Sequence, residues 1–235
     1  MRRPSLSLTF VLIAVIALFP AGAAAQQSFS LHLGGFVPRG EDTRVDDDVL
    51  FRNLFNGDDS LQFDVSDFNG ATVGAEWLFA LSDVVEAGLG AGYYRRTVPS
   101  FYADLVDETG ADIEQDLRLR IVPLTATVRF VPLSRGAAVQ PYIGAGVGVF
   151  SWRYSETGEF VDFDGTIFGG RFVGHDWAAG PVVLGGLRVP LGESDLGFEV
   201  RYQKAEGDLP PEEGFIGSKI DLGGFNYLLT FGVQF

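Results

Sequence analysis

The sequence contains no cysteine, and this absence excludes two ways of stabilising a protein. Without thiols the chain forms neither a disulfide framework nor a thiolate metal site. Lysine is almost absent too, because Lys204 and Lys219 are the only two. Asp and Glu number 31 against 17 Lys and Arg, which gives a formal net charge of −14. Such a chain is a poor partner for nucleic acid, whose binding depends on phosphate neutralisation by basic residues.

Residue types that commonly carry catalysis are also few. The two histidines are His32, which shares its parity with Ser30 and Gly34 in a stretch of strand character at 27–37, and His175, which precedes Asp176 in the link at 154–177. Neither Gly-x-Ser-x-Gly nor the His-x-Ser-Asn type pattern of one family of lipid A-modifying enzymes is present. Glycines repeat every second residue inside strands and do not open a helix, which argues against a phosphate loop. We predict no catalytic, metal-binding or cofactor-binding residue, and we expect His32 to be a packing residue.

Acidic residues gather in the predicted loops, at 46–48, 58–59 and 159–164. The segment Asp-Phe-Asp-Gly at 162–165 lacks the first ligand and the bidentate Glu of an EF-hand calcium loop. We therefore expect a solvated, mutually repulsive surface that keeps the loops apart. Weak surface binding of divalent cations is the alternative.

The one long apolar run lies at the N-terminus. Arg2 and Arg3 precede the apolar residues 6–19, and small residues follow with an A-x-A site at Ala23 and Ala25. The run is shorter than the about 20 residues that a spanning helix needs, so we prefer a signal peptide to an uncleaved anchor. The predicted division is a signal peptide at 1–25, cut after Ala25, and one domain at 26–235. Cleavage changes the formal net charge from −14 to −16.

Strand character recurs eight times in the mature chain. The stretches are 27–37, 68–80, 84–97, 116–131, 139–153, 178–191, 195–205 and 222–235. Short links at 81–83, 132–138 and 192–194 alternate with long links at 38–67, 98–115, 154–177 and 206–221. An even number of strands with alternating long and short links is typical of outer-membrane barrels. We predict an all-β fold, an eight-stranded antiparallel up-and-down transmembrane β-barrel.

The last strand has the clearest two-residue period. Its apolar parity is unbroken: Phe225, Tyr227, Leu229, Phe231, Val233 and Phe235. This face carries aromatic residues near both ends, as expected for a strand that faces lipid between two membrane interfaces.

The opposite parity of several strands carries charges of both signs. It places six charged residues inside the barrel: Glu76, Glu86, Glu199, Arg129, Arg188 and Arg201. Alternating glycines at 88–92 and 144–148 leave room for these long side chains in a narrow interior. Since unpaired buried charges are costly, we expect the six to pair and to plug the interior, leaving at most a narrow pore.

The signal peptide, the segment PYIGAGVG at 141–148 and the ending FGVQF at 231–235 resemble outer-membrane β-barrel proteins of the OmpA/OmpX type. The resemblance implies residence in the outer membrane of a Gram-negative bacterium and contact with its lipid and lipopolysaccharide. It also implies biogenesis through periplasmic chaperones and the barrel-assembly machinery, with Phe231, Val233 and Phe235 as the assembly signal.

We expect a monomer with a structural or surface-interaction role. Three alternatives stay open: a narrow porin-like channel, a lipid A-modifying outer-membrane enzyme and a periplasmic lipocalin-like ligand-binding barrel.

Overall fold

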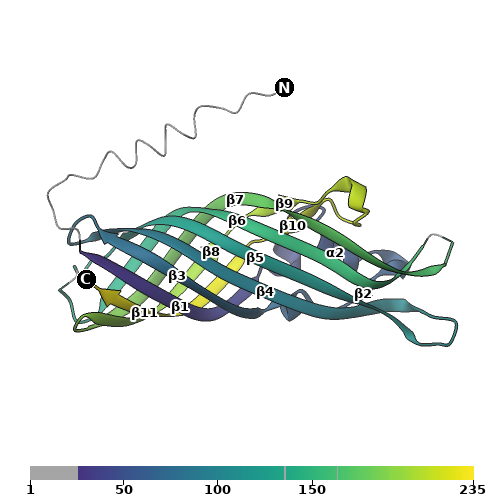
Figure 1. Cartoon of the computed structure of the whole chain (residues 1–235), viewed down its shortest axis with the longest axis horizontal. Coiled ribbons are helices and arrows are strands. Elements are labelled where there is room, and N and C mark those ends of the chain that lie inside the picture. Colours follow the sequence, from purple (N-terminus) through teal and green to yellow (C-terminus); the bar gives the residue numbers. More distant parts are fainter. Residues whose placement is uncertain (1–25, 135, 163) are drawn as a thin grey trace, which may run out of the picture.

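A computed structural model describes residues 26–134, 136–162 and 164–235. The predicted signal peptide, with Ala23 and Ala25, lies outside the described residues. Eight antiparallel strands close into a long barrel (Figure 1), which confirms the predicted fold class. They are β1 (Gln27–Pro38), β3 (Gly70–Ala80), β4 (Val85–Val106), β5 (Asp112–Phe130), β6 (Gln140–Val161), β7 (Ile167–Leu191), β8 (Ser194–Gln203) and β11 (Gly224–Gln234). In the described part of the chain, no helix has the length and apolar character to cross a membrane.

The barrel closes between its first and last strands. β1 and β11 pair antiparallel from Ser28 opposite Gln234 to Pro38 opposite Gly224. Beyond the last pair, the Phe235 amide donates to the Gln27 carbonyl at 2.9 Å and the Gln27 amide donates back at 3.2 Å. Closure leaves no open sheet edge in the ring, which is the condition for β-structure inside a bilayer.

The two ends of the barrel differ. Three short connections, at 81–84, 131–139 and 192–193, join strands at the end where the chain finishes, which we call the turn end. At the opposite end, the loop end, two long connections fold into small elements. The first holds η1 (Glu41–Thr43), α2 (Val49–Leu54), η2 (Gly57–Asp59), β2 (Leu61–Gln62) and η3 (Val65–Phe68). The second holds β9 (Glu206–Asp208), η4 (Pro211–Glu213) and β10 (Lys219–Asp221).

Three of the four central strands, β4, β6 and β7, are much longer than the sequence pattern indicated, and β5 begins four residues earlier. β4 continues to Val106 and β5 begins at Asp112, while β6 continues to Val161 and β7 begins at Ile167. The predicted long links at 98–115 and 154–177 are therefore wrong, because most of their residues belong to two strand hairpins that extend the barrel wall (Figure 1).

These extensions follow a reversed polarity, which explains the error. On β5, Leu124 and Val128 point outward while Thr127 points inward. Further toward the loop end, Ile121 is buried inside and Arg120 lies on the outer face. Along these strands the outer wall thus changes from apolar to charged while an apolar face turns inward, as is expected where a wall meets water.

The interior of the loop-end half of the barrel is consequently packed with apolar side chains, as in the core of a soluble protein. Apolar side chains from the strand extensions pack with those of the two long connections around Trp152, which is 1% exposed. We call this cluster the loop-end core. Its members include Phe36, Val49, Leu50, Phe68, Val98, Ile113, Leu117, Leu119, Ile121, Phe150, Trp152, Tyr154, Ile220 and Leu222.

Candidate functional site

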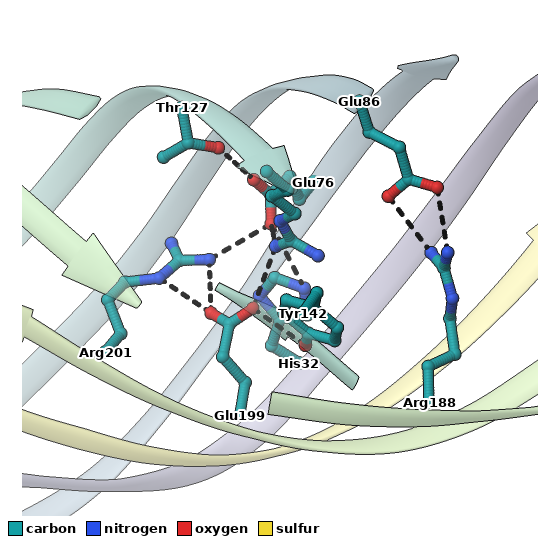
Figure 2. Close-up of polar contacts among 9 residues, drawn as sticks. His32, Glu76, Glu86, Thr127, Tyr142, Arg188, Glu199 and Arg201 are labelled. Atoms are coloured by element: carbon teal, nitrogen blue, oxygen red, sulfur yellow. Dashed lines mark hydrogen bonds and ion pairs between the residues drawn. The ribbon is translucent and has the colours of Figure 1, made fainter. Parts of the chain in front are cut away.

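The turn-end half of the barrel interior holds charge in place of apolar packing. The six charged residues predicted to face inward come from five strands, β3, β4, β5, β7 and β8, and none is more than 9% exposed. They form two groups of ion pairs across the interior (Figure 2).

The larger group joins two acids and two bases. Arg201 donates to Glu199 at 2.9 Å from Nε and to Glu76 at 3.0 Å from Nη2. Arg129 donates to Glu199 at 2.8 Å and also to Glu76. Each carboxylate therefore accepts hydrogen bonds from both arginines. The four residues together carry no net formal charge.

Neutral polar side chains complete this group. The Tyr142 hydroxyl donates to Glu199 at 3.0 Å, and the Thr127 hydroxyl donates to Glu76 at 3.0 Å. The Tyr142 ring also lies 4.8 Å from the Arg129 guanidinium carbon, a cation–π contact. A buried ion pair is stable only when its remaining hydrogen-bonding capacity is used, and these groups use much of it.

The smaller group lies nearer the turn end. Arg188 donates to both carboxylate oxygens of Glu86, at 2.8 and 3.3 Å, and its Nε donates to Gln140 at 3.0 Å. This two-bond geometry is the strongest form of an Arg–carboxylate pair.

Glycine makes space for both groups. Gly90 lies opposite Glu76, Gly144 opposite Arg129 and Gly186 opposite Glu199 in the strand register. At Gly88, a Cβ atom would lie 2.4 Å from a Glu76 carboxylate oxygen and 2.8 Å from the Thr127 hydroxyl. Any side chain larger than glycine at position 88 of β4 would thus displace the Glu76 carboxylate.

We expect Gly88→Ala to lower barrel stability, because the new methyl group overlaps a carboxylate that two arginines hold in place. Overpacking of this kind costs about 1–3 kcal/mol. Denaturant unfolding, followed by gel mobility of unboiled samples, measures the change. Gly110→Ala is no suitable control, because Gly110 has a φ of +84°. Gly40→Ala meets no atom within 4 Å and should leave stability nearly unchanged.

His32 lies inside the barrel beside the larger group. It is 5% exposed, and its Nε2 is 3.7 Å from a Glu76 carboxylate oxygen. Together with Arg201, it borders a small cavity of about 30 Å³, which is room for little more than water. A residue in this position does not face the lipid side, so its surroundings favour the packing role over a lipid-modifying one.

Three network residues were not singled out from the sequence: Thr127, Gln140 and Tyr142. All three share the inward parity of the charged or glycine residues on their own strands, so the same two-residue period identifies them. All three are uncharged and their residue types are common in loops as well, so the pattern of charges did not predict them.

The expectation of a solvated, repulsive acidic surface is wrong at Asp48, although Asp46 and Asp47 are exposed. Asp48 is fully buried, pairs with Arg44 at 2.6 Å and accepts the Leu50 and Phe51 amides of α2. Its other oxygen accepts the Asp221 amide at 2.6 Å, which ties the first long connection to the last.

Neighbouring acids strengthen this link. Hydrogen bonds from Ser218 lower the pKa of Asp47, while burial raises the pKa of Asp221 against the opposing effects of the Gly223 amide and of Arg44 and Arg39. Arg39 lies 3.1 Å from Asp221. Among the described residues, no group of three or more His, Cys, Asp or Glu is placed to hold a metal ion.

The predicted assembly residues lie on the outer face of β11. Phe231, Val233 and Phe235 are all exposed, with Phe235 at 67%. The Phe235 ring lies 6.1 Å from the Trp77 ring in an edge-on arrangement, and Trp77 in turn stacks with Phe79 at 5.9 Å. The terminal residue thus belongs to an aromatic group at the turn end.

Comparison with known proteins bears on the fold. No protein-family model matches the chain, and no curated protein matches it in sequence. Among solved structures, the outer membrane protein OprG from Pseudomonas aeruginosa is similar with a TM-score of 0.52 and 15% identity, over 90% of this chain and 96% of that one. Neisserial surface protein A aligns over 91% of this chain and 99% of its own, with a TM-score of 0.47 and 12% identity. The match to OprG shows that the chain has the fold of an outer-membrane β-barrel, as its resemblance to the OmpA/OmpX type predicted.

Proposed function

We propose that the chain is an integral protein of the bacterial outer membrane whose barrel is closed to solutes. Its role is structural or lies in surface interaction through the loop end. The observation that carries the proposal is the filling of the interior along its length, by ion pairs in the turn-end half and by the loop-end core beyond them.

The outer wall supports the membrane location. Its turn-end half exposes a continuous band of apolar side chains, and soluble proteins rarely expose an apolar surface of this extent. They include Leu31, Leu33, Val73, Leu89, Leu124, Val128, Ile143, Val147, Val183, Leu187, Leu196, Phe198, Leu229 and Phe231. Trp77 and Phe235 mark one edge of the band, and Tyr93, Tyr202 and Tyr227 lie toward the other, which matches two aromatic girdles. A soluble lipocalin-like barrel needs polar residues on this surface.

The interior supports closure. Arg129, Arg201, Glu76 and Glu199 join β3, β5 and β8 across the interior. An eight-stranded barrel is only wide enough for side chains to fill, so a bridging network leaves little room for solutes. Above the network, Phe150 and Trp152 from β6 are buried among residues of the loop-end core.

In planar lipid bilayers, we expect the purified protein to give no stable conductance steps. A trimeric porin measured in the same membranes serves as the positive control, and correct folding is checked by heat-modifiable gel mobility. Reproducible, long-lived steps from folded protein would overturn closure and favour the narrow-channel alternative.

The partners follow from the same proposal. They are the outer-membrane lipid and lipopolysaccharide around the barrel, and the periplasmic chaperones and barrel-assembly machinery during biogenesis. We further propose that the protein is a monomer that arrives through a signal peptide at 1–25. Fractionation of cells, with N-terminal sequencing of the mature protein, tests both the location and the cleavage after Ala25.

A further inference from the structure

A second charged feature lies on the outside of the barrel. In the strand register, Arg95 on β4 lies opposite Arg120 on β5, Arg120 lies opposite Arg153 on β6, and Arg153 lies opposite His175 on β7. Arg118 and Arg171 lie on the same wall and line a surface depression with Arg95, Arg120 and Arg153. We call these five arginines the arginine belt. They are a third of the 15 basic residues of the mature chain.

The arginine belt begins where the lipid-facing band stops. The row just before it consists of Val122, Ser151 and Trp177, which are neighbours in the register. Toward the turn end, the same outer face carries Leu124, Val147 and other apolar residues. Guanidinium groups at this level lie beside the headgroups of the leaflet at the loop end, while the wall beneath them contacts the acyl chains.

The positive charges of the arginine belt are not balanced by acidic side chains of the described residues. Like charges directly opposite each other on neighbouring strands destabilise a sheet, and two such pairs occur here in succession. Within the described residues, none of the five arginines forms an ion pair, although the chain is rich in acids. Arg118 donates from Nε to Thr97 at 2.9 Å. The Nε of Arg120, at the centre of the row, is buried without a hydrogen-bond partner.

The chemistry of a suitable ligand follows from these positions. Arginine forks bind phosphate oxygens through paired hydrogen bonds, and several arginines in one depression suit a ligand with more than one phosphate. A second depression shares Arg120 and Arg153 with the first and extends to His175 and Trp177. Among the residues that line the two depressions, Asp176 is the only acid, and its Oδ1 accepts the Trp177 amide at 2.8 Å. The adjoining apolar wall suits acyl chains on the same molecule.

We propose that the arginine belt binds the phosphate groups of the anionic, acylated glycolipid that forms the outer leaflet, with the acyl chains on the apolar band below. This inference rests on the proposed outer-membrane location. The ligand compensates the guanidinium charges that the chain leaves unpaired, and it fixes lipid to one side of the barrel, the side of β4 to β7.

Binding of lipid A to the full mature protein in nanodiscs of zwitterionic lipid tests the proposal. The probes are diphosphorylated lipid A, fully dephosphorylated lipid A and inorganic phosphate. We expect diphosphorylated lipid A to bind the wild type, and the Arg120→Gln/Arg153→Gln variant to bind it about tenfold or more weakly, because the variant loses charge-assisted hydrogen bonds to phosphate. The matched control, Arg52→Gln/Lys219→Gln, removes two basic residues from the loop end, both already paired with acids there, and should bind like the wild type.

Three results would overturn the proposal. They are equal binding of dephosphorylated lipid A, equal saturation by inorganic phosphate at matched concentration, and unchanged affinity of the arginine belt variant. Unboiled gel mobility confirms that both variants are folded. Because the assay uses purified protein in a defined membrane, its outcome is separate from the conductance and fractionation experiments that test the proposed function.

Discussion

Deletion of Phe235 is expected to remove most of the protein from the outer membrane. Phe235 ends the closing strand, and its backbone makes the last two hydrogen bonds between β11 and β1. Its exposed ring adjoins Trp77 at the turn end, where the resemblance to outer-membrane barrels places the aromatic residue that the assembly machinery reads. The heat-modifiable band in outer-membrane fractions, quantified by immunoblot, measures the loss.

Two variants separate recognition from simple loss of apolar area. Phe235→Tyr keeps an aromatic terminus and should accumulate nearly normally. Phe198→Ala removes an exposed Phe from the lipid-facing wall of β8 without changing the terminus, and should also assemble. Normal outer-membrane levels of the Phe235 deletion would count against the assembly role.

Glu199→Gln is expected to cause the largest loss of stability among single substitutions in the interior. Glu199 accepts hydrogen bonds from Arg129, Arg201 and Tyr142, and it is fully buried. The amide keeps the shape but leaves two guanidinium groups facing one remaining acid, Glu76. Breaking a buried ion pair from one side costs about 3–5 kcal/mol. Urea unfolding in lipid vesicles, with folded fractions read from gel mobility, gives the difference.

The controls use charge balance. Glu193→Gln removes an acid from an exposed turn and should change the free energy of unfolding by less than about 0.5 kcal/mol. The double variant Glu199→Gln/Arg201→Gln restores neutrality, so it should cost less than the two single variants combined. A Glu199→Gln protein as stable as the wild type would show that the network is not under electrostatic constraint.

The sequence was sufficient to predict the barrel and the inward position of the six charges. Both depend on a two-residue period, which is local and survives wherever one face meets lipid. The ion-pair partners of these charges could not be predicted from the sequence. Arg129 lies directly opposite Glu86 in the register, yet its hydrogen bonds go to Glu76 and Glu199. Those contacts cross the interior and depend on the stagger of the closed barrel, which no single strand encodes.

The strand extensions and the buried Asp48 were missed for related reasons. A search for outward apolar residues fails once a strand enters water, because the preferred face then changes sign, as between Leu124 and Arg120. Asp48 stands in a run of three acids that reads as solvated surface. Its partners include Arg44, close in sequence, and the Asp221 amide, which is 173 residues away.

The loop-end core has a consequence for the direction in which the barrel travels. Its members from α2 and β10 pack in one cluster with Trp152 and Leu117. In the proposed membrane location this cluster lies beyond the bilayer, so the long connections have to cross the membrane before it can form. Once they have packed, withdrawal of the barrel would expose this core to water and draw the charged wall around Arg120 and Arg153 into hydrocarbon. We therefore expect the packed loop-end core to oppose withdrawal of the inserted barrel and to hold it at a fixed depth in the membrane.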